Sequence, residues 1–267
     1  MPVLFEVHDL PTGRLGPAWL RAFLRIPGRK RLGIITRALD QALQRVYGPI
    51  PAGQVVIAPN GVDLEQYAGL PGPAQARREL DLPQALTVLC SGHLYAGRGV
   101  ELFLELAKRF PAASFVWVGG RPEDVAVYQS QARQAQLDNV IFSGFIAQQR
   151  LPRYQAAADI LLMPYDRVIA GSGGGNSAEI CSPMKMFDYL AAGRAILASD
   201  LPVFHEVLNG QNAAFALPGE VDAWTAALGR LLSDPLLRQG LGDQAGRDAQ
   251  AYTWRARAAR LLAGFPS

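Results

Sequence analysis

The sequence predicts an α/β protein built on parallel sheets. Short apolar runs alternate with longer amphipathic segments almost to the end of the chain. Most of these runs are continuously apolar rather than alternating, as in strands that are buried on both faces. The composition, 49% hydrophobic and 18% charged, excludes intrinsic disorder. Strand, helix and strand repeated in this way indicate parallel strands joined by right-handed crossovers.

The expected strands share an apolar core bounded by turn residues, and they cover 4–7, 32–36, 55–59, 86–92, 114–120, 139–144, 159–164 and 195–200. The expected helices carry apolar residues at helical spacing, and they cover 37–47, 99–109, 123–136, 149–157, 184–192, 220–232 and 235–262. Together they predict Rossmann-like domains.

The chain divides near residues 60–84, which hold several prolines and glycines and no strand pattern. We expect the end of an N-terminal Rossmann-like domain in 1–65 and a linker with an entry helix in 66–84. A complete C-terminal Rossmann-like domain is expected in 85–250. The helix of 251–267 is expected to return toward the N-terminal domain. In the alternative arrangement, residues 1–65 extend a single sheet.

Charge, cysteine content and hydropathy argue against several classes of protein. The chain has 26 basic and 23 acidic residues and no basic stripe, which favours a locally held anion over a nucleic acid. Two cysteines, Cys90 and Cys181, predict neither a disulfide scaffold nor a structural zinc site. No apolar run reaches the roughly 20 residues that span a bilayer. The first residues contain acids where a signal peptide has basic residues. We therefore expect a soluble cytoplasmic protein.

The segment 176–200 carries the strongest candidate site. Ser182 followed by Pro183 predicts a helix start, with serine capping free amides and proline in the first turn. Gly193 predicts the left-handed stop at the other end. Free amides near Ser182 suit a phosphate, because the positive end of the helix dipole lies there.

Two charged residues of this helix extend the hypothesis. Lys185 falls in the first turn, where a cation is unfavourable unless an anion also binds there. Asp188 lies three residues further and is able to accept two hydrogen bonds from a diol such as ribose. Alternatively, the two form a solvated surface pair that contributes little to stability.

The turn after the strand 86–92 is rich in glycine. Gly97 and Gly99 allow a close approach of the backbone to a ligand, and Arg98 is suited to bidentate contact with phosphate oxygens. The sequence contains neither G-x-G-x-x-G nor a Walker P-loop, so the usual nicotinamide and P-loop fingerprints are absent.

Two further features lie at expected strand ends. The Gly/Ser-rich loop 166–179 follows the strand 159–164 and is interpreted either as a mobile cover over a phosphate or as a connector without a role. His8 ends the first strand, where it faces a cleft between domains or serves a structural role.

Taken together, these segments resemble the family 4 (group 1) retaining glycosyltransferases of the GT-B fold. The matching phrases come in the family's order, and they are PNGVD (59–63), SGHLYAGRGVELFLELA (91–107), SFVWVGG (114–120), NVIFSGFI (139–146), LPRYQAAADILLMPY (151–165), SPMKMFDYLAAGRAILASD (182–200) and YTWRARAARLL (252–262). A weaker likeness appears in VLFEVHD (3–9).

The resemblance implies two facing Rossmann-like domains, with a sugar nucleotide on the C-terminal one and the acceptor on the N-terminal one. It implies no metal and no cofactor besides the nucleoside diphosphate sugar. The implied catalytic residues are His8, Arg98 and Lys185, and the implied donor-binding residues are Gly97, Gly99, Ser182, Pro183, Asp188, Phe145 and Ile146. Asp188 matches the second glutamate of the family's E-x7-E pattern, while the first falls at Ile180 with Glu179 one residue out of register. His93 stands where many relatives carry arginine.

The predicted function is transfer of a sugar from a nucleoside diphosphate sugar to a hydroxyl acceptor with retention of configuration. Family members carry a longer N-terminal part, so we expect this chain to lack the first strands of that domain. The alternative function is therefore a non-catalytic sugar-nucleotide-binding half of a split or truncated transferase. A sugar-nucleotide epimerase is a third interpretation, for which His8, His93 and His205 are the available histidines.

A basic stretch at 21–31 suggests peripheral contact with an anionic membrane, although Pro27 and Gly28 interrupt any helix there. A solvated helix face is the alternative. No recognisable residue pattern identifies the nucleotide base, the donor sugar or the acceptor.

Overall fold

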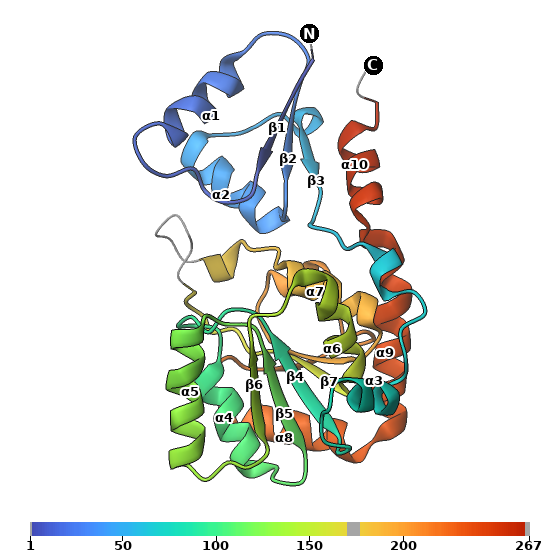
Figure 1. The fold of residues 1–267 in the computed structure, drawn as a ribbon. Helices are drawn as coiled ribbons and strands as arrows, with labels where there is room; N and C mark the ends of the chain where they lie inside the picture. The colour runs from blue at the N-terminus through green and yellow to red at the C-terminus, as the bar shows by residue number, and fades with distance from the viewer. Residues whose placement is uncertain (1, 170–176, 265–267) are drawn as a thin grey trace.

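A computed structural model describes residues 2–169 and 177–264, which form two parallel sheets in two stacked domains (Figure 1). The N-terminal sheet has the order β1-β2-β3. Its elements are β1 (Val3–Val7), α1 (Gly16–Arg25), β2 (Lys30–Ile34), α2 (Arg37–Tyr47) and β3 (Val55–Ile57).

The C-terminal sheet has six parallel strands in the order β6-β5-β4-β7-β8-β9, with helices on both faces. Its elements are α3 (Pro73–Glu79), β4 (Thr87–Ser91), α4 (Val100–Arg109), β5 (Ser114–Val118), α5 (Pro122–Gln134), β6 (Val140–Gly144), α6 (Leu151–Ala157), β7 (Ile160–Met163), α7 (Met184–Ala192), β8 (Ala195–Ser199), β9 (Ala214–Ala216), α8 (Val221–Ser233), α9 (Pro235–Ala249) and α10 (Trp254–Leu262).

The strands of the larger sheet could be predicted from the sequence because they are buried. Every residue of β4, β5, β7 and β8 is buried, as continuous apolar runs predict. One apolar layer packs α7 and α9 against the sheet, and the other packs α4 and α8 against its opposite face. All eight expected strands are confirmed in the structure.

Three elements differ from the expectation. The expected helix 235–262 is two helices, because the chain turns at Gln250–Tyr252 before α10 begins. The strand β9 has three residues, too few for a periodic signal. The helix α1 was not expected, yet Pro17 lies in its first turn, where proline favours a helix start.

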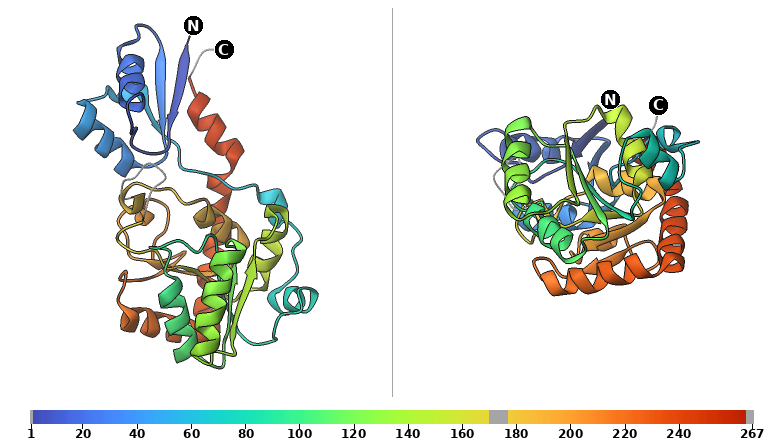
Figure 2. Two further views of the ribbon diagram at one scale, coloured as in Figure 1. Left: turned by 60° about the vertical axis from the view of Figure 1, so that its left-hand side comes forward. Right: turned by 60° about the horizontal axis from the view of Figure 1, so that its bottom comes forward.

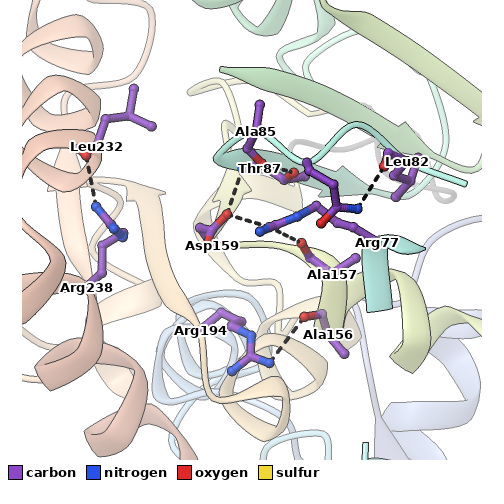
Figure 3. Close-up of polar contacts among 11 residues, drawn as sticks. Arg77, Leu82, Ala85, Thr87, Ala156, Ala157, Asp159, Arg194, Leu232 and Arg238 are labelled. Carbon is purple, nitrogen blue, oxygen red and sulfur yellow. Dashed lines mark hydrogen bonds and ion pairs between the residues drawn. The ribbon is translucent and has the colours of Figure 1, made fainter. Parts of the chain in front are cut away.

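The amino edge of the six-stranded sheet is held by arginines (Figure 3). Arg77 donates to Asp159 Oδ2 at 2.8 Å, and the same oxygen accepts the amide of Thr87 at 2.8 Å. Arg194 donates to the carbonyl of Ala156, and burial lowers the pKa of its guanidinium. These arginines satisfy carbonyls at the C-terminal end of α6, where cations are favourable to the helix dipole. This edge is stabilised internally and lies opposite the N-terminal domain (Figure 1).

Two chain segments cross side by side between the domains. Val62 of the linker and Thr253 form a parallel bridge, and α10 then runs along the N-terminal sheet (Figures 1 and 2). Arg257 of α10 donates to Glu6 Oε2 at 2.6 Å, and Arg31 donates to the carbonyl of Leu261 at 2.5 Å. The terminal helix therefore fastens the small sheet to the larger domain. No helix within the described ranges is long and apolar enough to cross a membrane.

Candidate functional site

The strand order places a site at the carboxyl edge of the larger sheet. Successive strands run outward on one side from β4 to β6 and on the other from β7 to β9, so the order reverses between β4 and β7. Ligands of open parallel sheets bind at such a switch point, outside the carboxyl ends of the strands. The loops after β4, β7 and β8 at this edge approach the N-terminal domain (Figure 1). The site therefore lies between the domains.

Two cations converge on one aromatic ring at this switch point. Arg98 follows β4, Lys185 lies in the first turn of α7, and Tyr165 follows β7. The Arg98 guanidinium carbon lies 4.7 Å from the centroid of the Tyr165 ring, and Lys185 Nζ lies 5.1 Å from it. Arg98 Nη1 also donates to the hydroxyl of Tyr165. The structure thus brings together Arg98 and Lys185, as the sequence predicted.

Arg98 and Lys185 form no ion pair in the part of the chain that the structure describes. Within residues 2–169 and 177–264, no carboxylate lies within ion-pair distance of Arg98 or Lys185. Lys185 Nζ instead contacts the buried thiol of Cys90, with its nitrogen 3.8 Å from Sγ. Two half-buried cations that form no ion pair in the described chain make a site suited to a multivalent anion, and Asp188 is a carboxylate on which the charge of Lys185 acts.

Close contact with the backbone after β7 requires glycine at two positions of the loop after β4. Gly97 and Gly99 both have positive φ, +80° and +77°. A Cβ on Gly97 would lie 2.4 Å from the carbonyl oxygen of Val168, and one on Gly99 would lie 2.0 Å from that of Pro164. Glycine therefore lets the β4 loop lie against the segment after β7, which places Arg98 on Tyr165.

The start of α7 differs from the expectation. Pro183, not Ser182, is the N-cap residue, the helix begins at Met184, and no side chain caps it. The Ser182 hydroxyl accepts the amide of Asn60 at 3.2 Å, and Asn60 Nδ2 donates to the Ser182 carbonyl at 2.7 Å. The predicted cap by Ser182 is wrong because the linker from the N-terminal domain occupies its oxygens. Among the described residues, no side chain therefore caps the first-turn amides of α7. Gly193 ends the helix with φ +62°, as predicted.

Asp188 lines a separate hollow next to this helix. A small pocket of about 40 Å³ lies between the linker, α6 and α7, and Tyr67, Gln148, Met184 and Asp188 contribute to its wall. Burial raises the pKa of Asp188 to about 6, while the neighbouring Tyr67 hydroxyl and the charge of Lys185 act in the opposite direction. The hydroxyl of Tyr67 is itself held by Gln155 Oε1 at 2.7 Å. The carboxyl group of Asp188 is thus poised to accept hydroxyl groups near neutral pH.

The remaining predicted residues lie around this centre. His8 is exposed, and its Nε2 lies 3.3 Å from Glu6 Oε2, with no recorded contact to Arg98 or Lys185 in the described parts of the chain. Burial raises the pKa of the Cys181 thiol to about 12, Arg98 lowers it, and Asp9, the neighbour of His8, raises it slightly.

The loop after β6 carries the predicted contacts to a base. Phe145 is 78% exposed at this loop, whereas Ile146 packs against the core. The backbone there is fixed, since Gly144 O accepts the amide of Gly119 at 2.9 Å. Residues 170–176 of the Gly/Ser-rich loop, and with them the predicted cover, lie outside the described residues.

Sequence reasoning missed three polar residues that shape the site. The ring of Tyr165 contacts both cations, Asn60 hydrogen-bonds to Ser182 just before α7, and Tyr67 lies beside Asp188. The position of Tyr165 directly after a buried strand was a usable signal, since the loops of neighbouring strands meet at the switch point. Asn60 likewise follows the expected strand 55–59, whereas Tyr67 gave no such signal and its partner is 88 residues away.

The comparison with protein families assigns the chain. Residues 85–234, more than half of it, match the family model described as "Glycosyl transferases group 1". The chain belongs to this family. Its fold matches solved GT-B structures, among them a sucrose-phosphate synthase from Thermosynechococcus elongatus, with a TM-score of 0.75 and 22% identity over 97% of this chain and 65% of that one. The structure of WaaG, "a glycosyltransferase involved in lipopolysaccharide biosynthesis", gives a TM-score of 0.72 at 18% identity, with 98% and 75% covered.

Curated relatives share more of the sequence. A "GDP-mannose-dependent alpha-(1-6)-phosphatidylinositol monomannoside mannosyltransferase" of Mycolicibacterium smegmatis is 28% identical over 85% of this chain and 59% of its own length. A "D-inositol 3-phosphate glycosyltransferase" of Kineococcus radiotolerans is 28% identical over 87% of this chain and 56% of its own length. The chain thus spans a little over half the length of these two relatives.

Proposed function

We propose that the protein transfers a sugar from a nucleoside diphosphate sugar to a hydroxyl acceptor. The observation that carries the proposal is the pairing of Arg98 and Lys185 on Tyr165, at the switch point and without an acidic partner in the described chain. A diphosphate supplies the negative charge that this arrangement lacks. Membership of the group 1 family supports the same reaction class.

The chemical step follows from this charge arrangement. The bond between the anomeric carbon and a diphosphate oxygen breaks, and negative charge develops on the departing diphosphate. Arg98 and Lys185, together with the uncapped amides at the start of α7, stabilise that charge. The acceptor hydroxyl bonds to the anomeric carbon and its proton passes to the departing phosphate. In this proposal the configuration is retained and the charge is balanced by protein groups rather than by a metal.

The names of the relatives guide the choice of ligands. One curated relative is described as GDP-mannose-dependent, and a solved structure with a TM-score of 0.75, HepE from Anabaena, is described as a complex with UDP-glucose. Both uridine and guanosine donors are therefore candidates for this chain. We assign the ribose diol to Asp188, the base to the backbone near Phe145 and Ile146, and the sugar side to His8.

The experiment is titration of the purified chain with UDP, GDP and ADP by calorimetry. We expect one of the three to bind, and Arg98→Ala and Lys185→Ala each to weaken that binding by about 10-fold or more, as for the loss of a charged hydrogen bond. Arg78→Ala, which removes an exposed cation of α3, serves as the control and should leave the affinity unchanged. Undiminished binding in both site variants would contradict the proposal.

A second candidate function is favoured by the edge of the N-terminal sheet. Among the described residues, β1 pairs with β2 on one side only, so its outer edge has free backbone groups. A strand from another polypeptide would complete this sheet, and the present chain would then act as a non-catalytic donor-binding half. Nucleotide binding without release of diphosphate from the matching sugar nucleotide supports this alternative, whereas turnover by the chain alone excludes it.

We further propose that the protein works in the cytoplasm and contacts an anionic membrane through α1. Leu15 and Trp19 on one side of this helix are 65% and 66% exposed. Arg14, Arg21 and Arg25 of the same segment are also exposed, so apolar and basic side chains of this segment are both accessible. One relative is named for transfer to a phosphatidylinositol monomannoside, a lipid, which agrees with an acceptor at a membrane surface.

A further inference from the structure

We infer that Tyr165 is a positioning residue that holds Arg98 and Lys185 side by side, so that a single diphosphate meets both cations. The inference deepens the proposed function and rests on it. It assigns a role to a residue that contacts the two cations and that is itself almost entirely buried, with 2% of its surface exposed.

The first step is that the hydroxyl and the ring of Tyr165 make different contacts with the two cations. The Tyr165 hydroxyl accepts from Arg98 Nη1, while no recorded hydrogen bond joins it to Lys185 in the described chain. The ring lies within cation–π distance of both, at 4.7 Å from the Arg98 guanidinium carbon and 5.1 Å from Lys185 Nζ. The hydroxyl therefore orients Arg98 alone, and the ring face supports both cations.

The second step is the rigidity of Tyr165. Ser199 Oγ donates to the Tyr165 carbonyl at 2.6 Å and to that of Met163 at 3.2 Å. The ring packs against Phe204 with centroids 5.5 Å apart. Ser199 at the end of β8 fixes the backbone, and Phe204 in the turn after β8 supports the ring, so Tyr165 provides an immobile surface for two otherwise flexible side chains.

The third step is the need for such a surface. Two like charges repel each other and, without an acidic partner, would move apart toward water when no donor is bound. The π electrons of the ring offset part of this repulsion and keep both cations within about 5 Å of its centroid. A diphosphate that arrives then finds its partners in place, because the cost of ordering two long side chains has already been met in the fold.

The experiment is a double-mutant cycle between Tyr165→Phe and Arg98→Ala. Binding of UDP, GDP, ADP and inorganic pyrophosphate is measured by calorimetry, and the last of these reports on the cation pair without a base. Tyr165→Phe removes the hydroxyl and keeps the ring, so we expect about 10-fold weaker binding in the parent chain. In the Arg98→Ala background the same substitution should have almost no effect, because the hydroxyl acts through Arg98.

The ring is tested by a further substitution. Tyr165→Leu should weaken binding more than Tyr165→Phe, and part of that extra loss should persist in the Arg98→Ala background, since Lys185 also loses its support. Thermal melts identify a variant that is merely unfolded. The control is Tyr128→Phe, which removes a tyrosine hydroxyl bonded to Glu101 on α4 and should leave anion affinity unchanged.

The outcomes separate this inference from the proposed function. Equal effects of Tyr165→Phe in the parent and Arg98→Ala chains would show a general structural role and overturn the inference, as would unchanged binding in the parent. If Arg98→Ala and Lys185→Ala weaken binding in either case, the proposed function stands. Absence of binding to all four probes by the folded parent chain would instead overturn the proposed function, and this inference with it.

Discussion

At the scale of single residues, Asp188 links binding to pH. Its pKa is raised by burial to about 6 from an ordinary value of 3.8, so the folded chain holds the proton more tightly than the unfolded chain does. The contribution of this group to the free energy of unfolding is therefore greatest below pH 4 and is lost as the pH rises through 6. Acceptance of hydrogen bonds from a diol has the opposite trend, because it needs the ionised carboxylate.

We predict that Asp188→Asn separates these two trends. At pH 8 the variant should be more stable than the parent, by up to about 3 kcal/mol from the shift of roughly two pKa units, and at pH 4 the two should be alike. At pH 8 its affinity for the nucleotide should nevertheless fall by about 10-fold. Denaturant melts and calorimetry at both pH values measure the two effects. Asp138→Asn changes an exposed aspartate and is the control. A variant that binds the nucleotide as well as the parent would remove Asp188 from the ribose site.

At the scale of elements, the exposed apolar residues at α1 lead to a prediction about membrane binding. Leu20 and Phe23 of this helix face the N-terminal core, so the exposed Leu15 and Trp19 are available for another surface. We expect the chain to float with anionic liposomes at low salt, and Trp19→Ser to reduce the floating fraction several-fold, since an apolar anchor is lost from a basic surface. Val127→Ser removes an exposed apolar side chain from α5 and is the control. Recovery of the parent chain in the soluble fraction with anionic liposomes would contradict the membrane contact.

The element α2 shows what sequence reasoning reached and where it ended. Its bounds, Arg37–Tyr47, agree with the expected range, because apolar spacing is a local feature, and the structure adds Thr36, expected in the preceding strand, as the capping residue. Its partners are not local. Glu206, 168 or more residues away, accepts the amides of Arg37 at 2.7 Å and Ala38 at 2.9 Å, and Thr36 Oγ1 donates to Ile180 O at 2.8 Å. The C-terminal domain thus completes the cap of a helix in the N-terminal domain.

The same limit applies to the candidate site. Arg98 and Lys185 were found because glycine turns and first-turn cations are signals within a few residues. The cap assigned to Ser182 was wrong because the competing donor, Asn60, comes from the linker. Tyr67 and Tyr165 act through the packing of separate elements, which apolar periodicity alone does not resolve.

At the scale of the whole molecule, the two crossings between the domains meet at Gly61. A Cβ at this position would lie 2.8 Å from the amide nitrogen of Trp254 and 3.0 Å from the carbonyl oxygen of Tyr252. Both are backbone atoms at the start of α10, and the adjacent Val62 exchanges backbone hydrogen bonds with Tyr252 and Trp254. Neither segment has a flexible side chain at this contact that could move aside. The absence of a side chain therefore lets the linker and the terminal helix cross in contact.

We predict that Gly61→Ala forces these crossings apart. Overpacking against backbone should lower the free energy of unfolding by about 1–3 kcal/mol. It should also loosen the hold of α10 on the N-terminal sheet, which scattering in solution would detect as a larger radius of gyration. Gly53→Ala is the matched control, since a Cβ there meets nothing within 4 Å and the residue has no positive φ. Equal stability and equal dimensions of the two variants would show that the domains are held by α10 and the cap of α2 without the contact at Gly61. A loss confined to Gly61→Ala, accompanied by weaker nucleotide binding, would show that the crossing also sets the start of α7, because Asn60 next to it holds Ser182.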